Sequence, residues 1–215
     1  MAFPTTNAAQ ELPAVNDILA SIGQAPVTSL DQTNPDVAIA YDTLLNASRE
    51  VQAEGWAFNT EEYYELPIDA TTGEVDIPTN VLQIDLHAEF DDQYDSIRRT
   101  KAGETQPKLY EKINHTYDWK TLTGWSSLRV DIVWEFDWID LPRPIQDYIA
   151  AKAAVLVSGR LVGDPQQINI LQSREAYTRA IALEYECNQG DYTIFGHQRG
   201  RKPYNSYKPY QALYR

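Results

Sequence analysis

The stretch from residue 142 to residue 190 constrains the fold most, because its helix start and stop signals lie close together. Gly163 predicts the end of one helix, and Asp164–Pro165 predicts the N-cap and first turn of the next. Gln167 occupies the N3 position of a capping box. So short a connection makes the two helices antiparallel neighbours. In the first helix a stripe of positions recurs at three- and four-residue steps: Ile145, Tyr148, Ile149, Lys152, Leu156 and Gly159. The second helix is predicted to run through Ile168, Leu171, Ala176, Tyr177, Ile181 and Tyr185.

Two more helices are predicted near the start of the chain. The first carries apolar residues at i, i+3, i+4 and i+7 and ends at Gly23; these residues are Val15, Ile18, Leu19 and Ile22. The second begins at Asn34–Pro35, again an N-cap followed by proline, and runs to about Gln52, before Gly55. We expect both to pack on the later pair as a four-helix core.

Between Trp56 and Trp138 the hydrophobic period changes from helical to two, which indicates strands. Residues 128–138 predict one long half-buried strand, and residues 82–86 predict a second. Shorter strands are predicted on either side of a turn at 71–73, over residues 63–66 and 74–77. The polar segment 91–119 is interpreted as one or two exposed hairpins or a long loop.

The predicted fold class is therefore α+β, with a four-helix core, an inserted antiparallel β-rich module and an extended C-terminal arm. The expected segments are residues 1–55 and 141–190 for the core, 56–140 for the module and 191–215 for the arm. No membrane-spanning run and no secretory signal is expected. Cys187, the single cysteine, excludes an internal disulfide and is expected to pack near a helix end in a reducing compartment.

Charge is divided unevenly along the chain. The net charge is −13, from 18 basic and 31 acidic residues. Residues 196–215 contain five of the basic residues and no acidic residue. Residues 1–195 therefore contain the other 13 basic residues and all 31 acidic residues, which gives them a net charge of −18. An acidic body repels nucleic acid, whereas the basic segment favours contact with acidic surfaces.

Several acidic and aromatic residues leave open a different function, a carbohydrate or cell-wall hydrolase. Such an enzyme needs two carboxylates about 5 to 10 Å apart across a sugar-binding cleft. The candidate acids are Asp85, Glu89, Asp91, Asp92, Asp131, Glu135, Asp137 and Asp140, and Trp125, Trp134 and Trp138 are candidates to line the cleft. The favoured interpretation is that these acids form the solvated face of the strands, while the tryptophans fill the core of the module.

Catalytic and metal-binding motifs are not evident in the sequence. His87, His115 and His197 lie in separate segments without paired cysteines, so each is interpreted as a strand or surface residue. No catalytic residue, metal or cofactor is predicted.

The arm has three interpretations. It is a solubilising tail, a segment that orders on a partner, or a nucleic-acid-binding tail in which basic and aromatic residues alternate. The second interpretation is favoured because arginines and lysines find an acidic surface, tyrosines anchor to it and prolines lower the cost of ordering. The acidic body argues against nucleic acid as the main ligand.

Four segments make the sequence similar to the tail tubular protein A family, the adaptors or gatekeepers of T-seven-like short-tailed phages. They are residues 14–30 (AVNDILASIGQAPVTSL), 54–58 (EGWAF), 136–142 (FDWIDLP) and 186–188 (ECN). The resemblance covers nearly the whole chain except the segment 91–119. It implies a non-enzymatic virion protein made in the host cytoplasm, which joins the portal to the nozzle protein, tail tubular protein B, and forms part of the DNA ejection channel.

The resemblance also implies partners and a binding segment. Family members form a twelve-fold ring whose helical cores pack against neighbouring copies, tail fibres attach at the junction of adaptor and nozzle, and the C-terminal segment embraces the portal. DNA is expected to pass without specific binding, and no stable membrane insertion is expected. The expected portal-binding residues are Arg199, Arg201, Lys202, Tyr204, Tyr207, Lys208, Tyr210, Tyr214 and Arg215.

Overall fold

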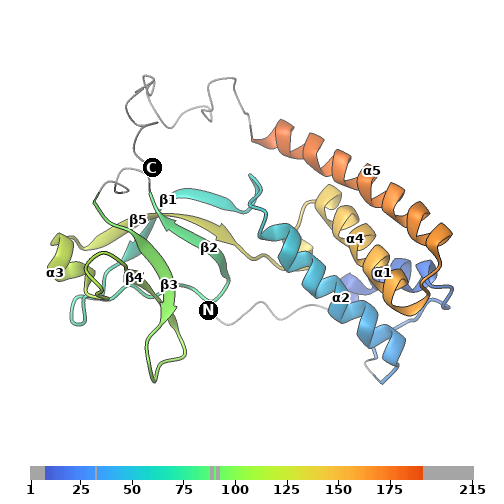
Figure 1. Ribbon diagram of the computed structural model, residues 1–215, viewed down its shortest axis with the longest axis horizontal. Helices are drawn as coiled ribbons and strands as arrows, with labels where there is room; N and C mark the ends of the chain where they lie inside the picture. Colours follow the sequence, from blue (N-terminus) through green and yellow to red (C-terminus); the bar gives the residue numbers. More distant parts are fainter. Residues whose placement is uncertain (1–7, 32, 88–89, 91–92, 191–215) are drawn as a thin grey trace.

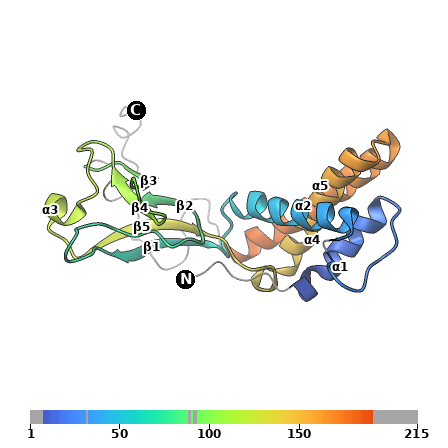
Figure 2. The ribbon, with the colours of Figure 1, turned by 90° about the horizontal axis from the view of Figure 1, so that it is seen from below.

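The computed structural model describes residues 8–190, apart from residues 32, 88–89 and 91–92, and the predicted arm lies outside the described residues. Strands gather at one end of the molecule and the four long helices at the other (Figures 1 and 2). The helices are α1 (Ala8–Ser21), α2 (Pro35–Gln52), α3 (Trp119–Thr123), α4 (Arg143–Leu161) and α5 (Pro165–Gln189), with a 3-10 turn η1 (Trp138–Asp140). The strands are β1 (Thr60–Pro67), β2 (Val81–Leu86), β3 (Ser96–Thr100), β4 (Pro107–Glu111) and β5 (Ser127–Trp134). The α+β fold class is confirmed; the segment boundaries predicted from the sequence remain a prediction.

Helix α4 lies at the centre of the helical part, because it contacts α1, α2 and α5. Ile145, Tyr148 and Ile149 are fully buried on it, and small alanines allow the neighbouring helices to approach. The other three predicted positions of the stripe on this helix are less buried than these: Lys152 and Leu156 are half-buried and Gly159 is exposed. One hydrophobic core joins all four long helices, so the predicted four-helix core is confirmed.

The predicted helix ends are correct, but the capping box is not. Asn34 and Asp164 cap α2 and α5 by accepting hydrogen bonds from the N–H groups of Asp36 and Gln166, both at 3.0 Å. Gln167 does not bond back to its own N-cap. Its side-chain amide donates to the carbonyl of Ser21 at the end of α1, so tertiary contact replaces the local motif.

Strand β5 is the middle of a three-stranded antiparallel sheet in the order β1-β5-β2. Its buried Leu128, Val130 and Ile132 alternate with outward residues as predicted. The strand ends at Trp134 rather than at residue 138. The chain leaves the sheet there because Phe136 and Trp138 pack against the helical core, and the Phe136 N–H donates to the Gln52 side chain at 2.7 Å.

The second core lies between this sheet and the β3–β4 hairpin. Segment 91–119 supplies the hairpin, as predicted, but it is not merely exposed. Leu109 and Trp119 are fully buried, and the Trp119 ring N–H donates to the Leu109 carbonyl at 2.8 Å. The predicted strand at residues 74–77 is wrong, because this segment forms only an isolated bridge between Asp76 and Lys108.

Polar groups join the helical part to the sheet. Asn59 is fully buried, and its side-chain amide donates to the carbonyls of Gln52 and Trp134, both at 2.9 Å. The carboxylate of Glu186, near the end of α5, accepts from the N–H of Ala57 at 2.9 Å. The C-terminal end of α5 is therefore fixed beside the chain that leads into β1 (Figure 1).

Glu11 is an unfavourable buried group in the helical part. It is 1% exposed, and neither of its carboxylate oxygens makes a hydrogen bond within the described residues. Burial raises the pKa of Glu11 above its usual value near 4.5; the nearby Tyr41 hydroxyl opposes this shift, and the Asp137 carboxylate adds to it. The folded state therefore binds a proton more tightly than the unfolded state does.

Replacing Glu11 with Gln should stabilise the protein at neutral pH. Because the folded-state pKa is raised, wild-type stability should fall as pH rises from about 4.5 through that pKa, and then level off. Glu11→Gln removes this loss, so we expect a gain of roughly 1 kcal/mol at pH 7.5 and little change at pH 4. Urea unfolding at both pH values measures it, with the exposed Asp42→Asn as control. A gain of the same size at both pH values would show that ionisation is not the cause.

Candidate assembly surfaces

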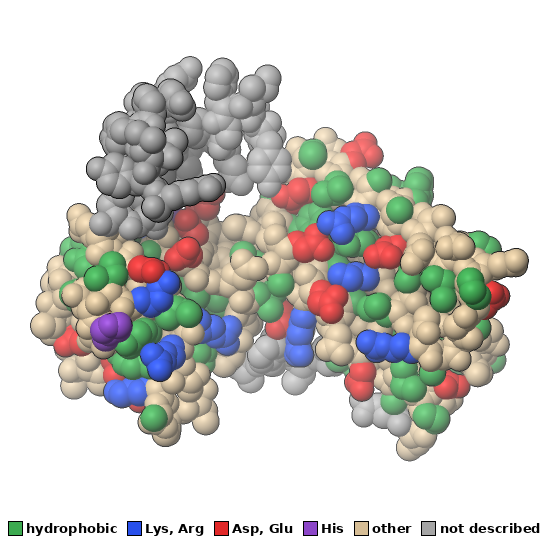
Figure 3. Space-filling view, viewed as in Figure 1, with side chains coloured by type: hydrophobic (Ala, Val, Ile, Leu, Met, Phe, Trp, Pro, Cys, Tyr) green, Lys and Arg blue, Asp and Glu red, His purple; other side chains and the backbone are tan. Residues whose placement is uncertain are grey.

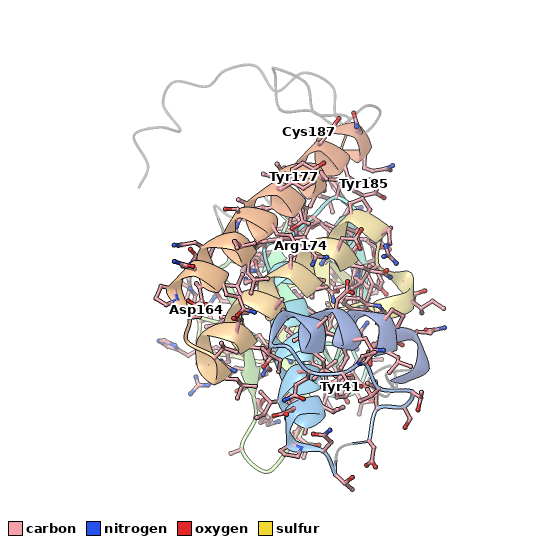
Figure 4. All side chains as sticks on the ribbon, turned by 90° about the vertical axis from the view of Figure 1, so that its right-hand side faces the viewer. Tyr41, Asp164, Arg174, Tyr177, Tyr185 and Cys187 are labelled. Atoms are coloured by element: carbon pink, nitrogen blue, oxygen red, sulfur yellow. The ribbon has the colours of Figure 1, made fainter. Side chains whose placement is uncertain are left out.

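Helix α5 is packed on one side only. Of its 25 residues, only Leu171, Ala182 and Glu186 are buried, although the helix packs against α4. It lies at the edge of the bundle, with Tyr177, Tyr185 and Cys187 along its C-terminal half (Figure 4). A long helix with so narrow a buried face leaves most of its surface available to a partner.

Apolar side chains are aligned on the outer surface of α5. Ile170 is 71% exposed, Tyr177 is 68% exposed and Ile181 is 37% exposed. With 100° per residue, these three lie within about 40° of one another, and about 120° from the buried face. We call Ile170, Tyr177 and Ile181 the α5 stripe. Tyr177 and Ile181 therefore lie on the outer face of α5 and not on the face that packs against the bundle.

Charged side chains surround the apolar ones on the visible face of both parts of the molecule (Figure 3). Several form bridges between elements, such as Arg174 to Asp17 at 3.6 Å and Arg179 to Glu54 at 3.3 Å. Such exposed pairs add little to stability. The nine predicted portal-binding residues lie outside the described residues, so their role remains a prediction.

The carboxylates proposed for hydrolysis do not form one group. Asp85 and Asp131 are cross-strand neighbours on β2 and β5, whereas Glu135 pairs with Arg49 of α2 at 2.9 Å. Asp140 is exposed in η1. Burial raises the pKa of Asp137, and the carboxylates of Asp140 and Glu135 add to this effect. Glu89, Asp91 and Asp92 lie outside the described residues.

The three candidate tryptophans occupy different places. Trp125 is 37% exposed and lies against Phe90, with ring centroids 4.8 Å apart. Trp138 packs on the helical core, and Trp134 lies at the edge of the sheet core. The prediction that all three fill the core of the module is therefore wrong. Trp119 is the fully buried tryptophan of that core, where its ring N–H bonds to a carbonyl.

The two described histidines agree with their interpretation as strand or surface residues, whereas the cysteine is not packed as expected. His87 is 3% exposed, and its Nδ1 lies 2.8 Å from Asp131 Oδ1, so it is a buried, paired strand-end residue. His115 is exposed and has a φ of 55°, and His197 lies outside the described residues. Cys187 is exposed rather than packed. Within the described residues no group of three or more histidines, cysteines or acids could hold a metal ion, and no helix has the length and apolar character to cross a membrane.

An outer helix with aligned, exposed apolar side chains is typical of one class of proteins, the subunits of larger assemblies. Comparison with known proteins agrees with this class. A family model described as tail tubular protein matches residues 12–192, and the chain belongs to that family. It is 26% identical to tail tubular protein A of Klebsiella phage KP34 over 183 residues, which cover 84% of this chain and 89% of that protein. The chain is therefore a structural protein of a bacteriophage tail.

The sequence itself contains a signal for the α5 stripe. Ile170 and Leu171 are adjacent, so they cannot both face the same core of a helix. Ile170, Tyr177 and Ile181 follow a spacing of seven and then four, which defines a second apolar face. Two apolar faces on one helix predict two sets of contacts.

Proposed function

We propose that the protein is the subunit of a head–tail adaptor ring, which joins the portal to the nozzle protein of a short-tailed phage and forms part of the DNA ejection channel. The α5 stripe carries this proposal, because it is an exposed apolar face on a chain whose family builds phage tails. Tail fibres attach at the junction of adaptor and nozzle, and the protein assembles after synthesis in the host cytoplasm.

We propose that twelve copies form the ring. The helical part supports a ring because its faces differ from one another. A ring requires a heterologous interface, in which one face of a copy meets a different face of the next. Helix α5 offers an apolar stripe on its outer side, while α1 and α2 lie on other sides of α4. The stripe of one copy would then pack on another helical face of its neighbour.

The uneven charge of the chain supports both the proposed DNA channel and the proposed contact with portal. Residues 1–195 carry a net charge of −18, which repels DNA within a Debye length of about 8 Å and lets it pass without specific binding. The basic segment 196–215 would bind acidic portal surfaces, and many arms acting together gain affinity through multivalency.

Imaging of the purified protein by negative-stain electron microscopy, alone and mixed with portal, tests this function. We expect closed rings that stack coaxially on the portal. A protein that stays monomeric at micromolar concentration and does not associate with portal would contradict the proposal. Turnover of glycan substrates, lost in Glu135→Gln and Asp137→Asn variants, would favour the hydrolase instead.

A further inference from the structure

A pocket of about 450 Å³ lies where β1 and the end of β5 meet the segment before β2 and the turn of the β3–β4 hairpin. Its walls are mainly aromatic and apolar, and two acids stand among them. The aromatic and apolar residues are Tyr64, Pro78, Trp134 and Phe136, and the acids are Glu61 and Asp76. We call this pocket the aromatic groove. None of its lining residues belongs to the α5 stripe or to the proposed portal-binding segment.

A β-bulge builds one wall of the groove. Glu61 pairs with Ile132 and Tyr64 pairs with Val130, so β1 has one residue more than β5 over this interval. Tyr63 has a φ of 62°, and its N–H donates to Asp131 at 3.0 Å. The extra residue brings Glu61 and Tyr64, three positions apart, onto the same face of the sheet.

Contacts hold these side chains in place before any ligand arrives. The rings of Tyr64 and Trp134 meet edge to face, with centroids 5.2 Å apart. The ring N–H of Trp134 donates to Glu61 Oε2 at 3.1 Å. Tyr64 still exposes 36% of its surface. A preformed aromatic surface of this kind binds ligands at low entropic cost.

The two acids give the groove a negative charge. The Asp76 side chain is 62% exposed, and its carboxylate lies 4.0 Å from the Lys108 ammonium, which also pairs with Glu74 and Glu104. Glu61 is exposed on the edge strand β1. Aromatic grooves with acidic side chains fit extended segments that carry prolines and basic residues.

Segment 196–215 of this same chain has that composition. It contains five basic residues and no acid, and its Arg-Lys-Pro-Tyr stretch, residues 201–204, combines a basic pair, a proline and a tyrosine. Its charge and its aromatic residues therefore complement the groove.

The segment is also long enough to reach the groove from the end of α5. Glu186 is bonded to the N–H of Ala57, so α5 ends beside the start of β1. Glu61 and Tyr64 are four and seven residues from residue 57, so they lie at most about 13 and 23 Å from it. The nine residues from Gly190 to Arg199 span up to about 30 Å, which is enough to reach the groove.

From these observations we infer that the aromatic groove binds residues 199–204 of its own chain before the arm meets the portal. Groove and portal then compete for one segment, and the groove keeps a basic, tyrosine-rich arm from binding other acidic surfaces before assembly. The contact within the chain does not depend on the portal as partner, so either proposal can fail alone.

Cysteine crosslinking in the full-length chain tests the inference. On a Cys187→Ser background, Gln106→Cys places a thiol at the groove and Asn205→Cys places one on the arm. With a short bis-maleimide at low protein concentration, we expect an intramolecular crosslink. The control pair uses Asn114→Cys, an exposed site on the loop after β4 that does not line the groove. It should crosslink at least about tenfold less.

Charge reversal of the groove should release the arm. Glu61→Lys with Asp76→Lys should lower the crosslinking yield about tenfold at low salt, a loss of about 1.4 kcal/mol. Glu65→Lys, on the same strand but outside the groove, should leave the yield unchanged. Matching circular dichroism spectra exclude unfolding as the cause.

Competition identifies the occupant. An excess of a free peptide with the sequence of residues 196–215 should suppress the crosslink, and an N-acetylglucosamine hexamer should not. Suppression by the sugar alone would mean that the groove binds carbohydrate and would overturn the inference. Equal crosslinking at the control site, or a product that is mainly a dimer, would overturn it as well.

Discussion

Deleting residues 196–215 should abolish binding to the portal while leaving the fold intact. The segment supplies five basic residues and four tyrosines. Because every copy in the ring would lose the same contact, the losses in binding affinity combine. We expect the affinity to fall at least about 100-fold, which is about 2.7 kcal/mol. The fold should persist because both hydrophobic cores are formed by residues before position 190.

Two partial variants separate the roles of charge and aromatic anchors. Neutralising Arg199, Arg201, Lys202 and Lys208 should slow association and remove its salt dependence. Replacing Tyr204, Tyr207, Tyr210 and Tyr214 with alanine should accelerate dissociation instead. Surface plasmon resonance against immobilised portal measures both rates. Binding of the truncated protein with unchanged affinity would refute the role of the arm, whatever the aromatic groove does.

Replacing Tyr177 with Glu should dissociate the ring into monomers. Tyr177 is 68% exposed in the isolated chain, so the change should cost the folded monomer little. At the centre of an interface, an aromatic residue contributes about 2 kcal/mol or more, which corresponds to roughly a 30-fold weaker contact at every junction. Multi-angle light scattering measures the assembly state, and the melting temperature reports on the monomer.

Leu183→Glu is the matched control for Tyr177→Glu. Leu183 is also apolar and 46% exposed on α5, but it lies about 140° from the α5 stripe around the helix axis. It should leave the ring intact. If both variants dissociate the ring equally, α5 acts through its general stability and the stripe is not the interface.

Local signals in the sequence predicted most of the helices. Asn34–Pro35 and Asp164–Pro165 specify helix starts by satisfying free N–H groups, and Gly163, with a φ of 69°, follows the end of α4. These effects involve neighbours within one turn, so they can be predicted without knowledge of the fold. The alternation of apolar and polar residues in β5 also involves only near neighbours, so it too can be predicted from the sequence.

Errors arose where a residue serves two parts of the fold. Residues 135–138 continue the alternation of β5, yet Phe136 and Trp138 belong to the helical core, so the strand stops at Trp134. Gln167 is placed for a capping box but bonds to Ser21 instead. Local pattern cannot distinguish these cases, because the competing partner is distant in sequence.

Sequence alone determined the chain's charge division, the positions and ends of its long helices, and its resemblance to phage adaptors, because each depends on residue type and local spacing. Only the tertiary structure decided which faces are covered. It showed that α4 is central, that α5 is packed on one side, and that a bulge in β1 brings Glu61 and Tyr64 together beside Trp134. Burial depends on what packs against a surface, and packing partners distant in sequence are fixed only when the chain has folded.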